Sequence, residues 1–115
     1  MKHIIEQVQN LNHDIHAASI QSLEAVESPF VLFTYTDLLG AVPQIVTDFM
    51  VKHGHHCVAV IASGNTNFGH ANFCASADKI ASQYHIPIWA KIDLRGGQSD
   101  YQKIIKQYKE RFLNE

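Results

Sequence analysis

The sequence predicts a single domain of the α/β class, a three-layer sandwich in which helices cover both faces of a parallel sheet. Two short segments in the middle of the chain are continuously apolar, which is typical of strands covered on both faces. Segments with helical periodicity alternate with the strands, and this alternation is the pattern of parallel α/β folds. The length of 115 residues (1–115) fits one domain.

The first half of the chain is predicted to hold two helices and two strands. Apolar residues fall on one helical face over residues 1–11, which predicts a helix that begins without a capping side chain. A weak strand is predicted over residues 19–26, and a β-prone run predicts a buried strand over Phe30–Tyr35. An amphipathic helix follows over residues 42–50, with Pro43 suited to its first turn.

The middle of the chain is predicted to form a turn, a second buried strand and a third helix. The buried strand covers residues 57–62, and the helix carries apolar residues on one face from Phe73 to Tyr84. The turn before the strand, residues 53–56, is rich in histidine. Because it joins a helix to a buried strand, we interpret it as a solvated turn rather than a metal site.

The last part of the chain is predicted to form a strand and a helix. Residues 88–94 alternate in polarity, as expected of a strand whose wetter face carries Trp89, Lys91 and Asp93. Trp89 could instead pack on the sheet or help to form a docking face, and the sequence leaves both open. Ser99 and Gln102 have the spacing of a capping box that opens the final helix. Its expected buried stripe comprises Tyr101, Ile104, Ile105, Tyr108 and Phe112.

Composition argues against several classes of function. Nine basic against 11 acidic residues leave a net charge of −2, which argues against broad electrostatic binding of nucleic acid or of an anionic membrane. Cys57 and Cys74 form no C-x-x-C pair, so we expect inert thiols rather than a disulfide framework or a zinc site. No apolar run approaches the roughly 18 residues of a membrane span, and no signal peptide is evident. These features favour a cytoplasmic protein.

Two loops are candidates for a binding site, because ligands of open parallel sheets bind beyond the carboxyl ends of the strands. The first loop covers residues 34–40 and the second residues 63–69. Gly and Asn in the second loop tolerate positive φ, so its backbone N–H groups can converge on a polar planar ligand, and Phe68 can stack on it. The alternative is a strand-to-helix turn whose Asn residues cap the next helix.

The second loop carries a specific resemblance. The string Ser63-Gly64-Asn65-Thr66-Asn67-Phe68-Gly69, the helix after it and the turn Leu94-Arg95-Gly96-Gly97 closely resemble the NrdI family. These are the flavodoxin-like proteins that serve class Ib ribonucleotide reductase. The segment from Pro29 to Thr36, continued through Gly40 to Val42-Pro43, resembles the family's matching earlier strand and loop. The resemblance runs from Ser28 to Phe112.

The resemblance implies an electron-transfer flavoprotein that holds FMN non-covalently, an accessory protein rather than a stand-alone enzyme. Family members reduce oxygen at the flavin and deliver the oxidant to the dimanganese small subunit of the reductase, which assembles its tyrosyl radical. A flavin reductase or another electron donor is a further candidate partner. The implied cofactor-binding residues are Thr34, Tyr35, Thr36, Gly40, Ser63, Gly64, Asn65, Asn67, Phe68 and Gly69.

The chain departs from the family pattern in two places. Leu38-Leu39 stands where many members have a glycine-rich loop or an aromatic residue. Residues 1–5 align with the positions directly after the family's phosphate-binding loop, so that loop and the first strand are not found. That strand is interior in the flavodoxin-like order 2-1-3-4-5. We therefore expect an N-terminally truncated domain with Phe30–Tyr35 as an exposed edge, whose true reading frame begins upstream.

Two functions of different classes follow. The first is an FMN-binding electron carrier that supports a class Ib ribonucleotide reductase in deoxyribonucleotide synthesis. The second is a flavin-free α/β interaction module or a non-functional truncated fragment, and the departure at the phosphate loop favours it. Flavin absorbance of the purified protein distinguishes them.

Overall fold

The computed structural model describes residues 2–11, 28–35, 42–64, 74–93 and 96–113, and the structural statements below concern these residues. The helices are α1 (Lys2–Leu11), α2 (Gln44–His53), α3 (Ala75–Tyr84) and α4 (Gln98–Tyr108), with the short helical turns η2 (Gly54–His56) and η4 (Lys109–Leu113). The strands are β1 (Phe30–Tyr35), β2 (Cys57–Gly64) and β3 (Ile88–Asp93).

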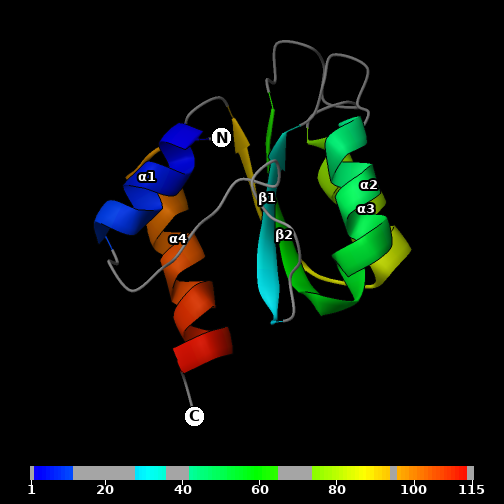
Figure 1. Cartoon of the computed structure of the whole chain (residues 1–115). Coiled ribbons are helices and arrows are strands. Elements are labelled where there is room, and N and C mark those ends of the chain that lie inside the picture. Colours follow the sequence, from blue (N-terminus) through cyan, green and yellow to red (C-terminus); the bar gives the residue numbers. More distant parts are fainter. Residues whose placement is uncertain (1, 12–27, 36–41, 65–73, 94–95, 114–115) are drawn as a thin grey trace.

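The three strands form a parallel sheet in the order β1-β2-β3. Helices α1 and α4 cover one face, and α2 and α3 cover the other (Figure 1). The prediction of a parallel α/β sandwich is thus confirmed. β2 lies in the middle, and its residues 59–62 are fully buried because both faces are covered. The weak strand predicted over residues 19–26 lies outside the described residues.

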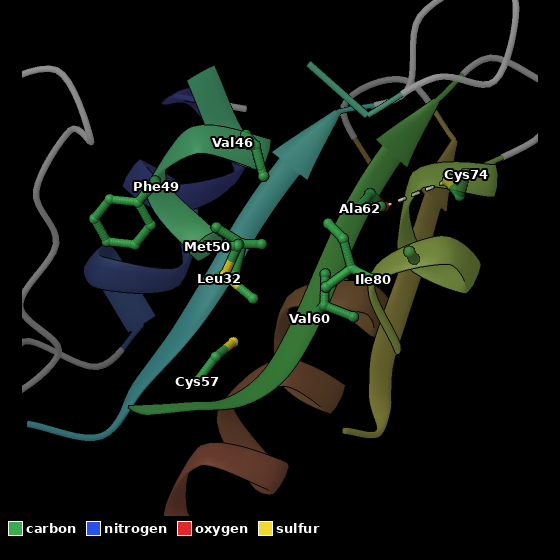
Figure 2. Packing of buried hydrophobic residues seen from close by; sticks show 10 residues of the cluster. Leu32, Val46, Phe49, Met50, Cys57, Val60, Ala62, Cys74 and Ile80 are labelled. Carbon is green, nitrogen blue, oxygen red and sulfur yellow. Dashed lines mark hydrogen bonds between the residues drawn. The ribbon is translucent and has the colours of Figure 1, made fainter. Parts of the chain in front are cut away.

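The face beneath α2 and α3 is the first of two hydrophobic layers (Figure 2). Its strand residues include Leu32, Val60 and Ala62. Helices α2 and α3 contribute Val46, Phe49, Met50, Ala77 and Ile80. The Phe30 and Phe49 rings meet edge to face, with their centroids 5.6 Å apart. Each such large side chain contributes roughly 1.5–3 kcal/mol when fully buried.

The opposite layer explains why the first helix forms. Ile4 and Val8 of α1 are each only 1% exposed and pack in one cluster with Ile61, Ile92 and Ile104. Tertiary burial therefore stabilises α1. Between residues 2 and 113, within the described ranges, no helix is both long and apolar enough to cross a bilayer.

A β-bulge changes the face on which Trp89 lies. Val60 pairs with Ile88 and Ile61 pairs with Ala90, so Trp89 is an extra residue in β3. Trp89 and Ala90 consequently both join the core under α1 and α4, and Trp89 is only 7% exposed. The alternation that placed Trp89 on the wetter face is therefore wrong for this residue, and of the two roles left open by the sequence the structure shows packing on the sheet. A second bulge makes Val58 the extra residue of β2 against β1.

The start of α4 also differs from the prediction. The helix begins at Gln98, and the Gly97 N–H donates a hydrogen bond of 2.9 Å to the Asp100 Oδ2 atom. The capping pair is therefore two residues earlier than the predicted Ser99 and Gln102. Gly96 explains the shift, because its positive φ of 72° reverses the chain directly before the helix.

Candidate functional site

The carboxyl ends of the three strands lie together at one edge of the sheet. Tyr35 at the end of β1 pairs in register with Ser63 of β2, and Gly64 pairs with Asp93 at the end of β3. Adjacent strands lie about 4.8 Å apart. The two loops that the sequence singles out thus leave the sheet from neighbouring positions, beyond Tyr35 and Gly64.

The end of β1 presents one polar side chain inward and one aromatic side chain outward. Thr34 is 2% exposed, and its hydroxyl donates to the Tyr35 carbonyl oxygen at 3.4 Å. Tyr35 is 52% exposed. The alternation of a strand produces this difference, since successive side chains point to opposite sides. Of the two, Tyr35 offers a ring surface to a ligand at this edge.

The end of β2 presents little side-chain bulk. Ser63 is buried at 8% exposure, and Gly64, the last residue of the strand, is half-buried. Because Gly64 has no Cβ, a flat ligand can approach the backbone closely there. The other candidate residues lie outside the described residues: Thr36, Gly40, Asn65, Asn67, Phe68 and Gly69.

Cys74 lies near the carboxyl ends of β2 and β3, just before α3, and this position differs from the one predicted. The sequence predicts Cys74 inside a helix, whereas it is the residue that precedes α3 and has a left-handed conformation, with φ 52°. Its Sγ atom is hydrogen-bonded to the Ala62 carbonyl oxygen, a contact drawn as a dashed line in Figure 2, and the two atoms lie 3.4 Å apart. The Ile92 carbonyl oxygen lies 3.8 Å from the same Sγ atom. The thiol therefore contacts both β2 and β3.

Burial raises the pKa of the Cys74 thiol to about 11, so the thiol is protonated at neutral pH. Smaller effects come from three nearby charges: Lys91 lowers the pKa, and Asp78 and Asp93 raise it. Lys91 and Asp78 form an ion pair of 2.9 Å between partly exposed side chains. Such a pair contributes about 0–1 kcal/mol. These charges border the candidate site on its β3 side.

The histidine-rich turn lies at the opposite end of β2. Residues 54–56 form η2 between α2 and β2, as the turn prediction expects, and the rings of His55 and His56 lie 4.1 Å apart. Within the described parts of the chain, no group of three His, Cys, Asp or Glu side chains is placed to hold a metal ion. A shallow groove of about 430 Å³ also lies at this end of the sheet, lined by Val58, Pro87, Trp89, Gln107, Glu110 and Arg111.

Known proteins resemble this chain along most of its length. The family described as NrdI Flavodoxin like matches residues 1–106. Protein NrdI of Bacillus licheniformis is 42% identical over 81 residues, which cover 70% of this chain and 61% of that protein. Protein NrdI of Deinococcus radiodurans is 33% identical over 93 residues, 80% of this chain and 65% of that protein.

A prophage relative is also similar. The SPbeta prophage-derived protein NrdI of Bacillus subtilis is 32% identical over 94 residues, 82% of this chain and 72% of that protein. The chain spans 61% of the Bacillus licheniformis relative and 65% of the Deinococcus radiodurans relative. The family match, these identities and the parallel α/β sandwich agree with the resemblance found in the sequence, and the chain belongs to the NrdI flavodoxin-like family.

Proposed function

We propose that this chain binds FMN and supports a class Ib ribonucleotide reductase as an electron-transfer protein. It would supply oxidant and electrons for assembly of the dimanganese-tyrosyl radical cofactor. The observation that carries the proposal is the register pairing of Tyr35 with Ser63 in a member of the NrdI family. This pairing starts both candidate flavin loops at one edge of the sheet.

The described residues at this edge fit a flavin ring. The isoalloxazine ring is a flat aromatic system with a polar pyrimidine edge, and the exposed Tyr35 side chain offers it an aromatic contact. Gly64 leaves room for the ring to approach the backbone. When bound, FMN would supply the electron transfer and the reduction of oxygen, whereas the protein supplies binding and orientation.

The remaining contacts are proposed from the family resemblance. Thr34, Tyr35, Thr36 and Gly40 would line one side of the ring. On the other side, Asn65 and Phe68 would make the closest contacts, with Ser63, Gly64, Asn67 and Gly69 completing the loop. Backbone N–H groups of this second loop would donate to the pyrimidine edge.

The proposed partners also follow from family membership. The dimanganese small subunit of a class Ib ribonucleotide reductase would receive the oxidant, and a flavin reductase or another donor would reduce the flavin. Electron transfer requires the flavin edge to face the partner. The exposed carboxyl edge of the sheet around Tyr35 is therefore the proposed docking side.

Binding of FMN to the purified chain tests the first part of the proposal. We expect titration with FMN to quench flavin fluorescence and to shift the visible absorbance bands. The variant Tyr35→Ala should bind FMN about three- to ten-fold more weakly, since an aromatic contact contributes about 0.5–1.5 kcal/mol beyond its buried area. Val51→Ala is the control, because Val51 is 74% exposed on α2. A chain that stays colourless and leaves FMN fluorescence unchanged would favour the flavin-free module.

Assembly of the radical tests the second part. The FMN-loaded chain, a reductant and oxygen would be added to the manganese-loaded small subunit, and the tyrosyl radical would be measured by electron paramagnetic resonance. We expect a radical signal that depends on the chain and on FMN together. Equal signals with free FMN and with the loaded chain would contradict the proposed role.

A further inference from the structure

A shallow groove lies between the end of α1 and the solvent-exposed side of α4. It has a volume of about 400 Å³ and is lined by Leu11, Gln102, Ile105, Lys106 and Lys109. The four lining residues of α4 and η4 have the spacing i, i+3, i+4 and i+7, which places them on one stripe of the helix surface. Leu11 is the last residue of α1, which lies beside α4 on the same face of the sheet (Figure 1).

The groove offers an incomplete apolar contact. Leu11 is 46% exposed, and Ile105 is half-buried against the core under α1 and α4. An apolar side chain placed between them would remove apolar area of both residues from water. Because single exposed leucines are ordinary on protein surfaces, the apolar contact alone does not identify a ligand.

The charge of the groove indicates the chemistry of its ligand. Lys106 and Lys109 are the charged residues among those that line it, and both are exposed. Within the described residues, neither lysine forms an ion pair with a carboxylate. Residues 98–113 hold four of the nine basic residues of the chain but two of its 11 acidic residues, so this segment is basic on an otherwise acidic chain. The groove therefore favours a ligand that carries negative charge.

We propose that this groove docks an acidic segment of a partner protein. An apolar side chain of that segment packs between Leu11 and Ile105, and carboxylates beside it pair with Lys106 and Lys109. Since the two lysines share one helical stripe, carboxylates with helical spacing on the partner reach both, as in other helix-in-groove contacts. The proposal is independent of flavin binding, because the groove lies on the face under α1 and α4 and not at the carboxyl edge of the sheet.

A protein segment fits this surface better than a membrane or a nucleic acid does. A helix that lies on a membrane inserts a broad apolar face, whereas Leu11 is the large apolar side chain that is exposed among the lining residues. Proteins that bind single-stranded nucleic acid stack its bases on aromatic rings, and no aromatic residue lines this groove. A concave site with one apolar contact and two cations instead matches a short acidic segment.

Fluorescence anisotropy of two labelled peptides tests the proposal on the full chain. Both peptides are amphipathic helices with leucine on one face, and they carry either glutamate or lysine at the same flanking positions. We expect the glutamate peptide to bind and the lysine peptide not to bind. Raising the salt from about 0.1 to about 1 M should weaken binding, because the screening distance falls from about 10 to about 3 Å.

Two pairs of variants locate the contact. Lys106→Glu should weaken binding of the glutamate peptide about two- to 30-fold, because it replaces one exposed ion pair by a repulsion. Lys52→Glu changes the net charge equally on the exposed side of α2 and should leave binding unchanged. Leu11→Ala should weaken binding about three- to ten-fold, whereas Val51→Ala on α2, at a position that is 74% exposed, should not.

A charge swap separates lost contacts from lost folding. The double variant Lys106→Glu with Lys109→Glu should bind the lysine peptide in place of the glutamate peptide, which an unfolded chain would not do. Circular dichroism checks that each variant is folded. Should Leu11→Ala not fold, the lysine variants decide, because both lysines are exposed.

Several results would overturn the proposal. These are no binding of the glutamate peptide to the folded wild-type chain, equal binding of both peptides, or equal losses in Lys106→Glu and Lys52→Glu. Vesicles that contain phosphatidylserine and single-stranded DNA serve as further probes. If Lys106→Glu abolishes binding of either probe while the glutamate peptide does not bind, the groove recognises a membrane or a nucleic acid instead. No FMN is present in these measurements, so failure of the proposed function does not affect them.

Discussion

Gly54 lies directly against the ring of Tyr84, so close that a Cβ atom at position 54 would lie 2.5 Å from the Tyr84 Cε1 atom. The contact joins the turn after α2 to the end of α3. It explains why a glycine occupies this buried position between His53 and His55.

The first prediction concerns this contact. Gly54→Ala should lower the free energy of unfolding by about 1–3 kcal/mol, the usual cost of overpacking a filled site. Chemical denaturation measures the change. Val51→Ala is the control, because Val51 is 74% exposed on α2. If Tyr84→Ala does not relieve the defect of Gly54→Ala in the double variant, the ring contact is not its cause.

A second prediction concerns the end of α3. His85 has a left-handed conformation with φ 56°, and its N–H donates to the Ala81 carbonyl oxygen. A glycine suits this position better, so His85→Gly should raise the free energy of unfolding by about 0.5–1 kcal/mol. His85→Val should lower it, because a β-branched side chain disfavours this conformation most. Urea midpoints that do not separate the two variants would refute the explanation.

The third prediction distinguishes the observed cap of α4 from the one expected from sequence. Asp100→Ala removes the carboxylate that accepts the Gly97 N–H and should cost about 0.5–2 kcal/mol. Gln102→Ala should have an effect of less than about 0.5 kcal/mol, because Gln102 is an exposed helix residue. Thermal unfolding of the two variants measures the difference. A larger loss for Gln102→Ala would support the capping box predicted from sequence.

A fourth prediction concerns alkaline pH. The Cys74 pKa rises from an ordinary value of 9.0 to about 11 in the folded chain. The unfolded chain therefore releases this proton first, so the contribution of Cys74 to stability is complete below pH 9 and is lost as the pH rises through 11. Between these pH values, C74A should lose less free energy of unfolding than the wild-type chain. If the free energies of unfolding of the two proteins, measured against pH, changed in parallel over this range, the explanation would be contradicted.

The order of the elements that the structure describes was predictable from the sequence because it depends on local periodicity. The apolar run at β1 and the amphipathic pattern of α2 need no knowledge of distant residues, and both elements form where expected. The pairing of Tyr35 with Ser63 also follows from a general rule, since the carboxyl ends of parallel strands meet at one edge.

The features that sequence reasoning missed depend on tertiary contacts. Trp89 changes faces because a bulge inserts it into β3, and its carbonyl oxygen accepts a hydrogen bond of 3.0 Å from the Gln107 side chain of α4. The left-handed backbone of Cys74 is stabilised by strands that precede and follow it in the chain. Residues adjacent in sequence indicate neither the contact of Trp89 with Gln107 nor the contacts of Cys74 with β2 and β3.

The packing of α1 on α4 has a consequence for folding kinetics. The first and the last helix of the chain share one hydrophobic layer, so their contacts have nearly the largest sequence separation that the chain allows. Closing so long a loop costs entropy before any contact forms, and we expect this layer to assemble after the transition state. Val8→Ala should therefore speed unfolding and leave the refolding rate almost unchanged in stopped-flow measurements. Slower refolding would instead place α1 in the folding nucleus.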